Sequence, residues 1–159
     1  MAEELVKYAL IGITTEQFAT ISEPKESGFG LNVSISIKSD YENRGIGLNL
    51  SLKFEESESV FMIVETTTHF VIDAEWWDHK SNGGQDNVVL DKDFITHLLT
   101  IAIGVTRGVV HAKTENTPFN RYIVPLINVS ELGGEDVIII KHNKKSTILW
   151  YSIKYRFHC

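Results

Sequence analysis

The stretch from Asp91 to Gly108 constrains the fold most, because it is the one segment with an unambiguous helical pattern. At about 100° per residue its apolar side chains cover an arc of roughly 200°, wider than the stripe of an ordinary surface helix. The rest of its circumference carries no acidic or basic residue before Arg107 and consists of Thr96, His97, Thr100 and Gly104. We therefore predict a helix that starts at Asp91, ends at Gly108 and is covered on two sides, by its own sheet and by a second subunit.

The length of 159 residues predicts a single domain over residues 1–159 with a sizeable core. The net charge of −6 disfavours general nucleic-acid binding, which needs clustered lysine and arginine. Cys159 is the only cysteine, so an intrachain disulfide is excluded. No run approaches a membrane span, and the N-terminal residues lack the basic start of a signal peptide. These features predict a cytoplasmic protein with neither a nucleic-acid nor a membrane partner.

Two segments show the strict alternation of β-strands that have one buried face. The alternating apolar residues are Leu31, Val33, Ile35 and Ile37 in the first segment and Leu48, Leu50, Leu52 and Phe54 in the second. A short strand is expected at Glu16–Ile21, and a longer one from Val60 onward with Trp76 and Trp77 at its end. The tail after Gly134 has the pattern of two extended segments joined by a turn at 142–145. The order of elements predicts an α+β fold, in which the helix lies on one face of an antiparallel sheet and a strand-like tail follows.

Recognisable catalytic and metal-binding motifs do not occur in the sequence. There is no phosphate-binding glycine motif and no nucleophile elbow, and the six histidines lack the spacing of zinc ligands. One polar cluster, made of Asp73, Glu75, Asp78 and His79, could support acid–base chemistry or could form a solvated strand end that protects a sheet edge. We favour the solvated strand end, because nothing nearby supplies a nucleophile, a metal or an anion hole. The sequence therefore predicts no enzymatic activity, no metal and no cofactor.

Aromatic residues are in surplus outside the expected core of sheet and helix, at Trp76, Trp77, Trp150, Tyr151, Tyr155 and Phe157. They could build a second small core under the C-terminal tail. They could also line an exposed apolar groove, which on a soluble protein usually marks a partner surface. An edge strand beside such a groove could accept an extended peptide as an additional strand. The sequence leaves both interpretations open.

From Phe54 to Leu132 the chain resembles the SecB family of export chaperones and their relatives. The resemblance lies in the strand phrase from Phe61 to Ile72, the helix that runs into Thr106-Arg107-Gly108, and the phrase Pro125-Leu126-Ile127-Asn128, in that order. It implies a four-stranded antiparallel sheet with helices on one face, assembled into homodimers or homotetramers through the long helix. It also implies the binding of unfolded polypeptides in apolar grooves without ATP. SecB itself delivers such polypeptides to the translocation motor SecA, a role in protein transport.

We therefore predict an ATP-independent, chaperone-like protein that holds unfolded or extended polypeptide segments in apolar grooves. The expected peptide-binding residues are Phe70, Ile72, Trp76, Trp77, Tyr151 and Tyr155. The expected contact between subunits is formed by His97, Thr100, Ile103 and Gly104. The alternative is a dedicated interaction module for one folded partner, such as a toxin or a protein encoded by a mobile element. A third and less favoured hypothesis is a small hydrolase that uses Asp73, Glu75 and His79.

Overall fold

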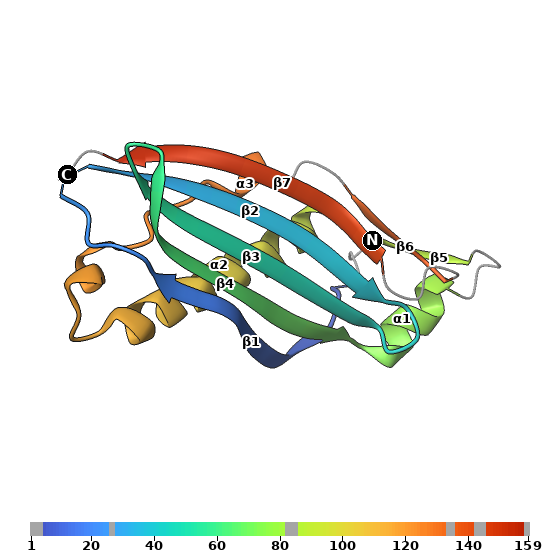
Figure 1. The fold of residues 1–159 in the computed structure, drawn as a ribbon. Coiled ribbons are helices and arrows are strands. Elements are labelled where there is room, and N and C mark those ends of the chain that lie inside the picture. The colour runs from blue at the N-terminus through green and yellow to red at the C-terminus, as the bar shows by residue number, and fades with distance from the viewer. Residues whose placement is uncertain (1–4, 26–27, 82–85, 133–135, 142–145, 158–159) are drawn as a thin grey trace.

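A computed structural model describes residues 5–25, 28–81, 86–132, 136–141 and 146–157; for Leu132 and residues 146–152 it describes the backbone alone. The strands are β1 (Tyr8–Thr20), β2 (Phe29–Asp40), β3 (Gly45–Glu56), β4 (Ser59–Ile72), β5 (Asn87–Leu90), β6 (Val137–Ile140) and β7 (Ser146–Phe157). The helices are α1 (Ala74–Ser81), α2 (Lys92–Thr114), the 3-10 helix η1 (Pro118–Arg121) and α3 (Val129–Leu132). Figure 1 shows a long twisted sheet with α2 behind it, which confirms the predicted α+β class.

Among the described residues the main sheet has five strands in the order β1-β4-β3-β2-β7, and every neighbouring pair is antiparallel. The strands β2, β3 and β4 follow one another as a meander, while β1 and β7 form the two edges. The expected number of four strands is therefore too small, because the C-terminal tail pairs with β2 and adds β7. The strands β5 and β6 pair separately as a small two-stranded sheet.

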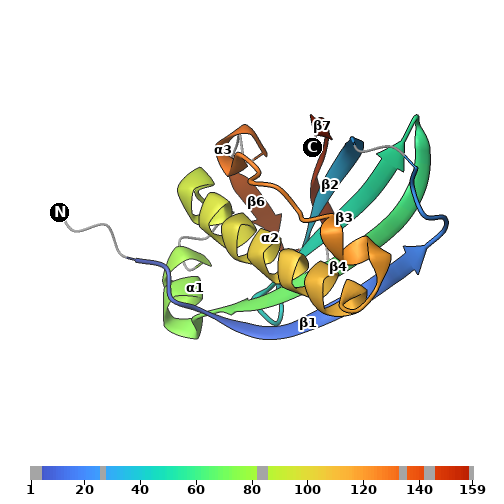
Figure 2. The same cartoon turned by 90° about the vertical axis from the view of Figure 1, so that its left-hand side faces the viewer.

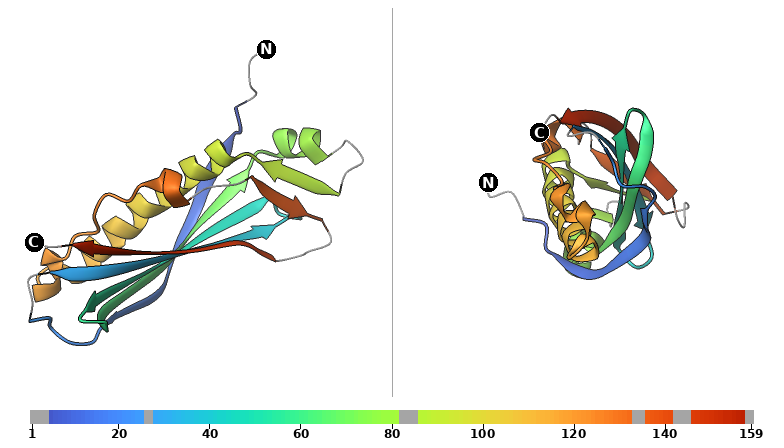
Figure 3. Two further views of the ribbon diagram at one scale, coloured as in Figure 1. Left: turned by 90° about the horizontal axis from the view of Figure 1, so that it is seen from above. Right: turned by 60° about the vertical axis from the view of Figure 1, so that its left-hand side comes forward.

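The core lies between the main sheet and α2, which packs over β3 and β4 (Figures 2 and 3). The alternation predicted in β2 and β3 is confirmed, since all eight apolar residues of that pattern are buried on the helix-covered face. The polar residues between them lie on the opposite face of the sheet. None of the described helices covers that opposite face, which we call the open face.

The helix α2 begins as predicted but ends later. A carboxylate oxygen of Asp91 accepts a hydrogen bond from the backbone N–H of Phe94 at 2.9 Å, which caps the helix. The predicted end at Gly108 is wrong, because the helix continues to Thr114. Val110 and Thr114 in the added turns are buried, and their packing outweighs the low helix propensity of glycine, a cost of about 1 kcal/mol. The left-handed residue Asn116, with φ at 61°, follows the helix end.

Trp76 and Trp77 lie in α1 and not in a strand as predicted. The carboxylate of Asp73 accepts a hydrogen bond from the backbone N–H of Trp76 at 3.1 Å, so it starts a helix directly after β4. Both indole side chains are buried, and Trp77 packs edge-on against Tyr41 with 5.4 Å between the ring centroids. These two tryptophans therefore belong to the same hydrophobic core as the buried side chains of the main sheet.

One buried pair of hydroxyls joins α2 to the sheet. Thr106 donates to the carbonyl oxygen of Ala102 at 2.8 Å, so the 2.8 Å contact between Thr66 and Thr106 has Thr66 as its donor. Both threonines are fully buried. Replacing Thr106 by valine leaves the Thr66 hydroxyl without its acceptor, and we expect a loss of about 1–3 kcal/mol in the free energy of unfolding.

The same replacement at the partner residue, Thr66→Val, leaves Thr106 bonded to Ala102. It is expected to lower the free energy of unfolding by less than about 1 kcal/mol. The double variant removes both hydroxyls and should recover part of the stability lost in Thr106→Val. Urea unfolding of the three variants measures these differences. Equal losses in the two single variants would contradict the assignment of donor and acceptor.

Candidate functional site

Four of the six residues expected to bind peptides lie in the core. Phe70 and Ile72 point from β4 toward α2 and are 1% exposed, while Trp76 and Trp77 of α1 are 6% and 3% exposed. The expectation that these side chains form an open apolar surface is therefore wrong, because the sheet, α1 and α2 enclose them. Tyr151 lies in β7, and its side chain is outside the described residues.

Tyr155, the sixth expected residue, is half-buried on β7 and stacks near Phe157, with 6.0 Å between the ring centroids. Its hydroxyl oxygen is buried and has no hydrogen-bond partner among the described residues. Burial, followed by the negative charge of Glu131 in α3, raises the pKa of the Tyr155 phenol above its ordinary value. The side chain thus closes the core beside β7 and presents little of its surface to a ligand.

The raised pKa of Tyr155 predicts a dependence of stability on pH. The unfolded chain loses the phenol proton near pH 10, before the folded chain does, so the free energy of unfolding should fall as pH rises above about 10. In Tyr155→Phe this contribution is absent, and removal of an unpaired hydroxyl should raise stability at pH 7 by about 1 kcal/mol. Urea unfolding at pH 7 and pH 10.5 tests both statements; identical pH dependence in the two proteins would contradict them.

The outer edge of β1 is an open and apolar feature of the described structure. The strand pairs with β4 on one side and has no second neighbour among the described strands. Leu10, Ile11 and Ile13 are 45%, 64% and 50% exposed, and no charged residue or proline occurs from Tyr8 to Thr15. Sheet edges in soluble proteins are normally protected by charges, prolines or a covering element. An edge this long and this apolar is suited to pairing with another chain.

The sequence leaves this segment open between a helical turn and an extended edge, and the structure makes Tyr8–Ile13 part of the edge strand β1, where the run ALIGI at Ala9–Ile13 carries no charge. The structure also shows why the run lacks a clean alternation. The register with β4 shifts between Leu10 and Gly12 and again between Thr15 and Gln17. Because of the first shift, Leu10 and Ile13 both lie opposite buried residues of β4 and face the side on which α2 packs.

The outward face of α2 contains three of the four predicted subunit contacts. His97, Thr100 and Gly104 are exposed, whereas Ile103 is buried, so its assignment to this face is wrong. At 100° per residue Ile103 is turned about 100° from Gly104, far enough to reach the core. A side chain at Gly104 or Gly108 would meet nothing within 4 Å.

A hydrogen bond between Tyr8 and His97 connects this helix face to β1, and the Tyr8 ring also packs edge-on against Phe94 of α2. The exposed face of α2 therefore continues into the helix-facing side of β1. We call this combined region the β1–α2 surface; it is formed by Leu10, Ile13, His97, Thr100, Gly104 and Gly108. None of these six residues is an aspartate, glutamate, lysine or arginine.

Two further apolar patches lie elsewhere on the molecule. In the small sheet, Val89, Ile138 and Ile140 are about half exposed on the outward face. In the connection between η1 and α3, Ile123 and Leu126 are strongly exposed. That connection is held to α2 by Arg107, which donates to the backbone carbonyls of Val124 at 3.1 Å and of Pro125 at 3.0 Å. The Arg-Gly step and the Pro125 phrase, which carry the family resemblance, are thus in direct contact.

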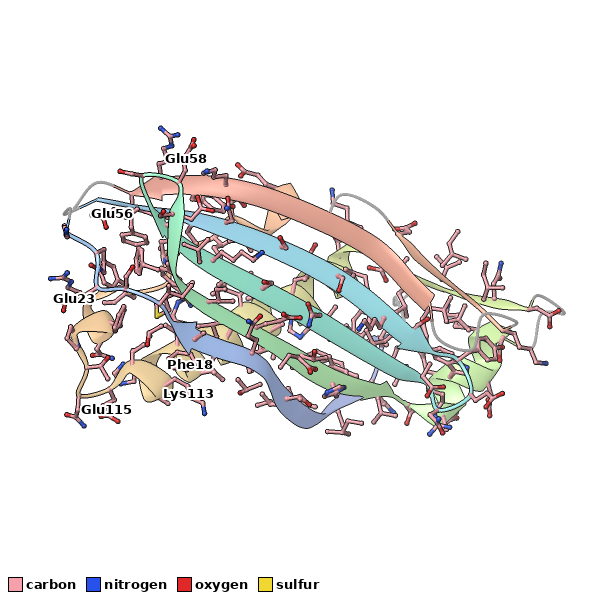
Figure 4. The ribbon with its side chains drawn as sticks, in the orientation of Figure 1. Phe18, Glu23, Glu56, Glu58, Lys113 and Glu115 are labelled. Atoms are coloured by element: carbon pink, nitrogen blue, oxygen red, sulfur yellow. The ribbon has the colours of Figure 1, made fainter. Side chains whose placement is uncertain are left out.

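Charged side chains gather at the end of the molecule where α2 finishes. Figure 4 shows Glu23, Glu56, Glu58, Lys113 and Glu115 at this end; Lys113 lies in the last turn of α2, and Glu115 follows directly after it. Lys113 and Glu115 are exposed, so they give the β1–α2 surface a polar border at the C-terminal end of α2. An apolar centre with a polar rim is the usual anatomy of a protein-binding surface.

The polar cluster considered for catalysis lies along the start of α1. Asp73 is engaged in capping that helix, and Glu75, Asp78 and His79 are exposed on it. Among the described residues there is no group of three histidine, cysteine, aspartate or glutamate side chains placed to hold a metal ion. Within this cluster, Asp73 thus has a structural role as the cap of α1.

Comparisons with protein-family models, with curated proteins and with solved structures found no match for this chain. In the described part of the chain, one helix, α2, is long and apolar enough to cross a membrane by length and composition. Of its most apolar 18-residue window, 44% is buried inside the protein. The high hydropathy of α2 thus reflects both its packing on the sheet and the uncharged face that it leaves exposed.

Proposed function

We propose that this chain is an ATP-independent, chaperone-like protein of SecB-like type that holds unfolded or extended polypeptide segments. The observation that carries the proposal is the open, apolar and uncharged edge of β1. This edge takes the place of the aromatic groove expected from the sequence. The resemblance of the strand, helix and Pro125 phrases to SecB relatives supports the same function, and a cytoplasmic location belongs to the proposal.

Binding would proceed by addition of the client as a further strand next to β1. The unpaired backbone groups of β1 supply hydrogen bonds that do not depend on the client sequence, and this suits a protein with many clients. Client side chains on the helix-facing side would cover Leu10 and Ile13, at about 25 cal/mol per Å² of apolar area removed from water. Because the gain per residue is small, binding is reversible and requires no nucleotide.

Assembly into dimers or tetramers is part of the same proposal. The exposed face of α2 is uncharged, and glycine at 104 and 108 permits the close approach of a second helix. A second copy of the chain offers the same face, so a two-fold contact centred near Gly104 is self-complementary. Such a contact would leave the outer backbone edge of β1 available for clients.

The test is the aggregation of a reduced, unfolded client protein, followed by light scattering in the absence of ATP. We expect suppression at about one client per assembled complex. Absence of any effect at several-fold excess contradicts the proposal. A single folded protein that co-purifies tightly, together with indifference to unfolded clients, would instead establish the dedicated interaction module.

A further inference from the structure

The open face of the sheet has a hollow of about 560 Å³ on the side away from α2. Strand pairing places Gly12, His69, Gly47 and Lys38 in one row across β1, β4, β3 and β2. Two of the four positions in this row are glycine. His69 therefore lies between Gly12 and Gly47, and Lys38 lies next to Gly47, where no side chain covers the sheet. The volume falls within the usual range of small-molecule sites, about 300–1,000 Å³.

Gly47 forms the floor between the two nitrogen-bearing side chains. A Cβ atom built on Gly47 would lie 3.9 Å from Nδ1 of His69 and 3.9 Å from Cβ of Lys38. The other ring nitrogen of His69, Nε2, is 2.9 Å from the hydroxyl of Thr14. When Thr14 donates this hydrogen bond, the ring proton is on Nδ1, and that N–H is directed to the space above Gly47.

The neighbouring polar groups are already occupied by one another. The Thr67 hydroxyl donates to Glu16 at 2.8 Å and accepts from Asn49, whose side-chain amide also donates to Glu65. At the other side of the hollow, the Asp40 carboxylate accepts from the backbone N–H and the side-chain amide of Asn43. Lys38 is exposed, and no ion pair or hydrogen bond of its side chain occurs among the described residues. The hollow therefore offers donors from Lys38 and His69.

We propose that this hollow binds an organic carboxylate, with the carboxylate above Gly47 between Lys38 and His69 and an apolar substituent against Ile11. Two donors on opposite sides of one floor match the two oxygens of a carboxylate. A single lysine next to Asp40 favours a monoanion over a phosphate dianion. Ile11, which lines the hollow from β1, is 64% exposed and supplies the apolar wall. This site is separate from the β1–α2 surface and does not depend on the proposed chaperone activity.

Two sources could supply this chemistry: a free small carboxylic acid, or the C-terminal carboxylate of a polypeptide. Titrations followed by the NMR signals of the Gly47 amide and the His69 ring distinguish them, with hexanoate and N-acetylleucine as probes. Saturation by both probes assigns the site to free carboxylic acids. Saturation by N-acetylleucine alone assigns it to polypeptide C-termini, and either result supports the proposal.

Three variants make the test specific. Lys38→Gln should weaken binding by about tenfold, as expected for loss of one charge-assisted hydrogen bond. Gly47→Ala should weaken it similarly by filling the floor, and its new Cβ makes only ordinary contacts of 3.5 Å or more, so the fold is retained. Lys53→Gln removes another exposed lysine from the same face of β3 and should leave binding unchanged. The proposal is overturned if neither carboxylate shifts the NMR signals of the Gly47 amide and the His69 ring, or if inorganic phosphate is the only probe that shifts them. It is also overturned if N-acetylleucinamide, which lacks the carboxylate, shifts them as much as N-acetylleucine does, or if Lys38→Gln binds the carboxylates as tightly as the wild type.

Discussion

The double variant Leu10→Lys/Ile13→Lys is expected to lose the protection of an unfolded client while the protein itself stays folded. Both side chains are about half exposed, so their replacement removes little from the core. Full burial of such a side chain contributes about 1.5–3 kcal/mol, and covering the exposed half contributes about 1 kcal/mol per residue. The two losses, with two charges added to the edge, should weaken client binding by about 30-fold or more.

A matched control exists in the small sheet. Ile138 and Ile140 are 50% and 45% exposed, against 45% and 50% for Leu10 and Ile13. The variant Ile138→Lys/Ile140→Lys therefore adds the same charge and removes the same kind of surface at a different place. Light scattering of the aggregating client should show normal protection by this control. Loss of protection in the control, with normal activity of the β1 variant, would move the binding site to the small sheet.

The second large effect is expected at Gly104, in the centre of the exposed face of α2. Gly104→Arg should convert the assembly to monomers, because a self-complementary contact would place two like charges face to face without partners. The arginine meets no atom of its own chain within 4 Å of its Cβ, so the fold should be unaffected. Solution mass from multi-angle light scattering should fall to that of one chain.

Gly104→Ala is the control variant: it removes the same glycine without adding the bulk and the charge of arginine, so it shows which of these changes affects assembly. Alanine raises helix stability by about 1 kcal/mol and adds only a methyl group, so the assembly should persist and unfold at higher denaturant concentration. A wild-type protein that is already a monomer, or a Gly104→Arg protein of unchanged mass, is incompatible with a subunit contact on α2. Neither result would bear on the pairing of clients with β1.

The parts of the fold that were predictable are those in which one periodicity dominates. In β2 and β3 the alternating apolar residues are buried on the helix-covered face, so the alternation from Leu31 and from Leu48 determined both the strands and their buried face. The start of α2 was predictable because Asp91 is a local cap. Its end was not, because the burial of Val110 is a long-range effect that overrides the local signal of Gly108.

The candidate surfaces were harder to predict because they depend on register and on which strand lies at an edge. A partly exposed edge strand such as β1 has no strict alternation, and the shift after Leu10 changes which side chains share a face. The sequence predicts Trp76 and Trp77 outside the core, because nothing local to them shows that α1 turns their side chains inward. The row that joins His69 and Lys38 across Gly47 combines three strands, and sequence spacing alone does not bring them together.

The strand order also bears on how this protein is made. The hairpins of β2, β3 and β4 join neighbouring segments, so they can form early and locally, whereas β7 must return from the far end of the sequence to pair with β2. During synthesis, therefore, the growing chain passes through a stage in which the outer edge of β2 is as open as that of β1. The open edge of β2 could then pair with other chains and aggregate until β7 is synthesised. An already assembled copy of this protein could cover that edge in a nascent copy.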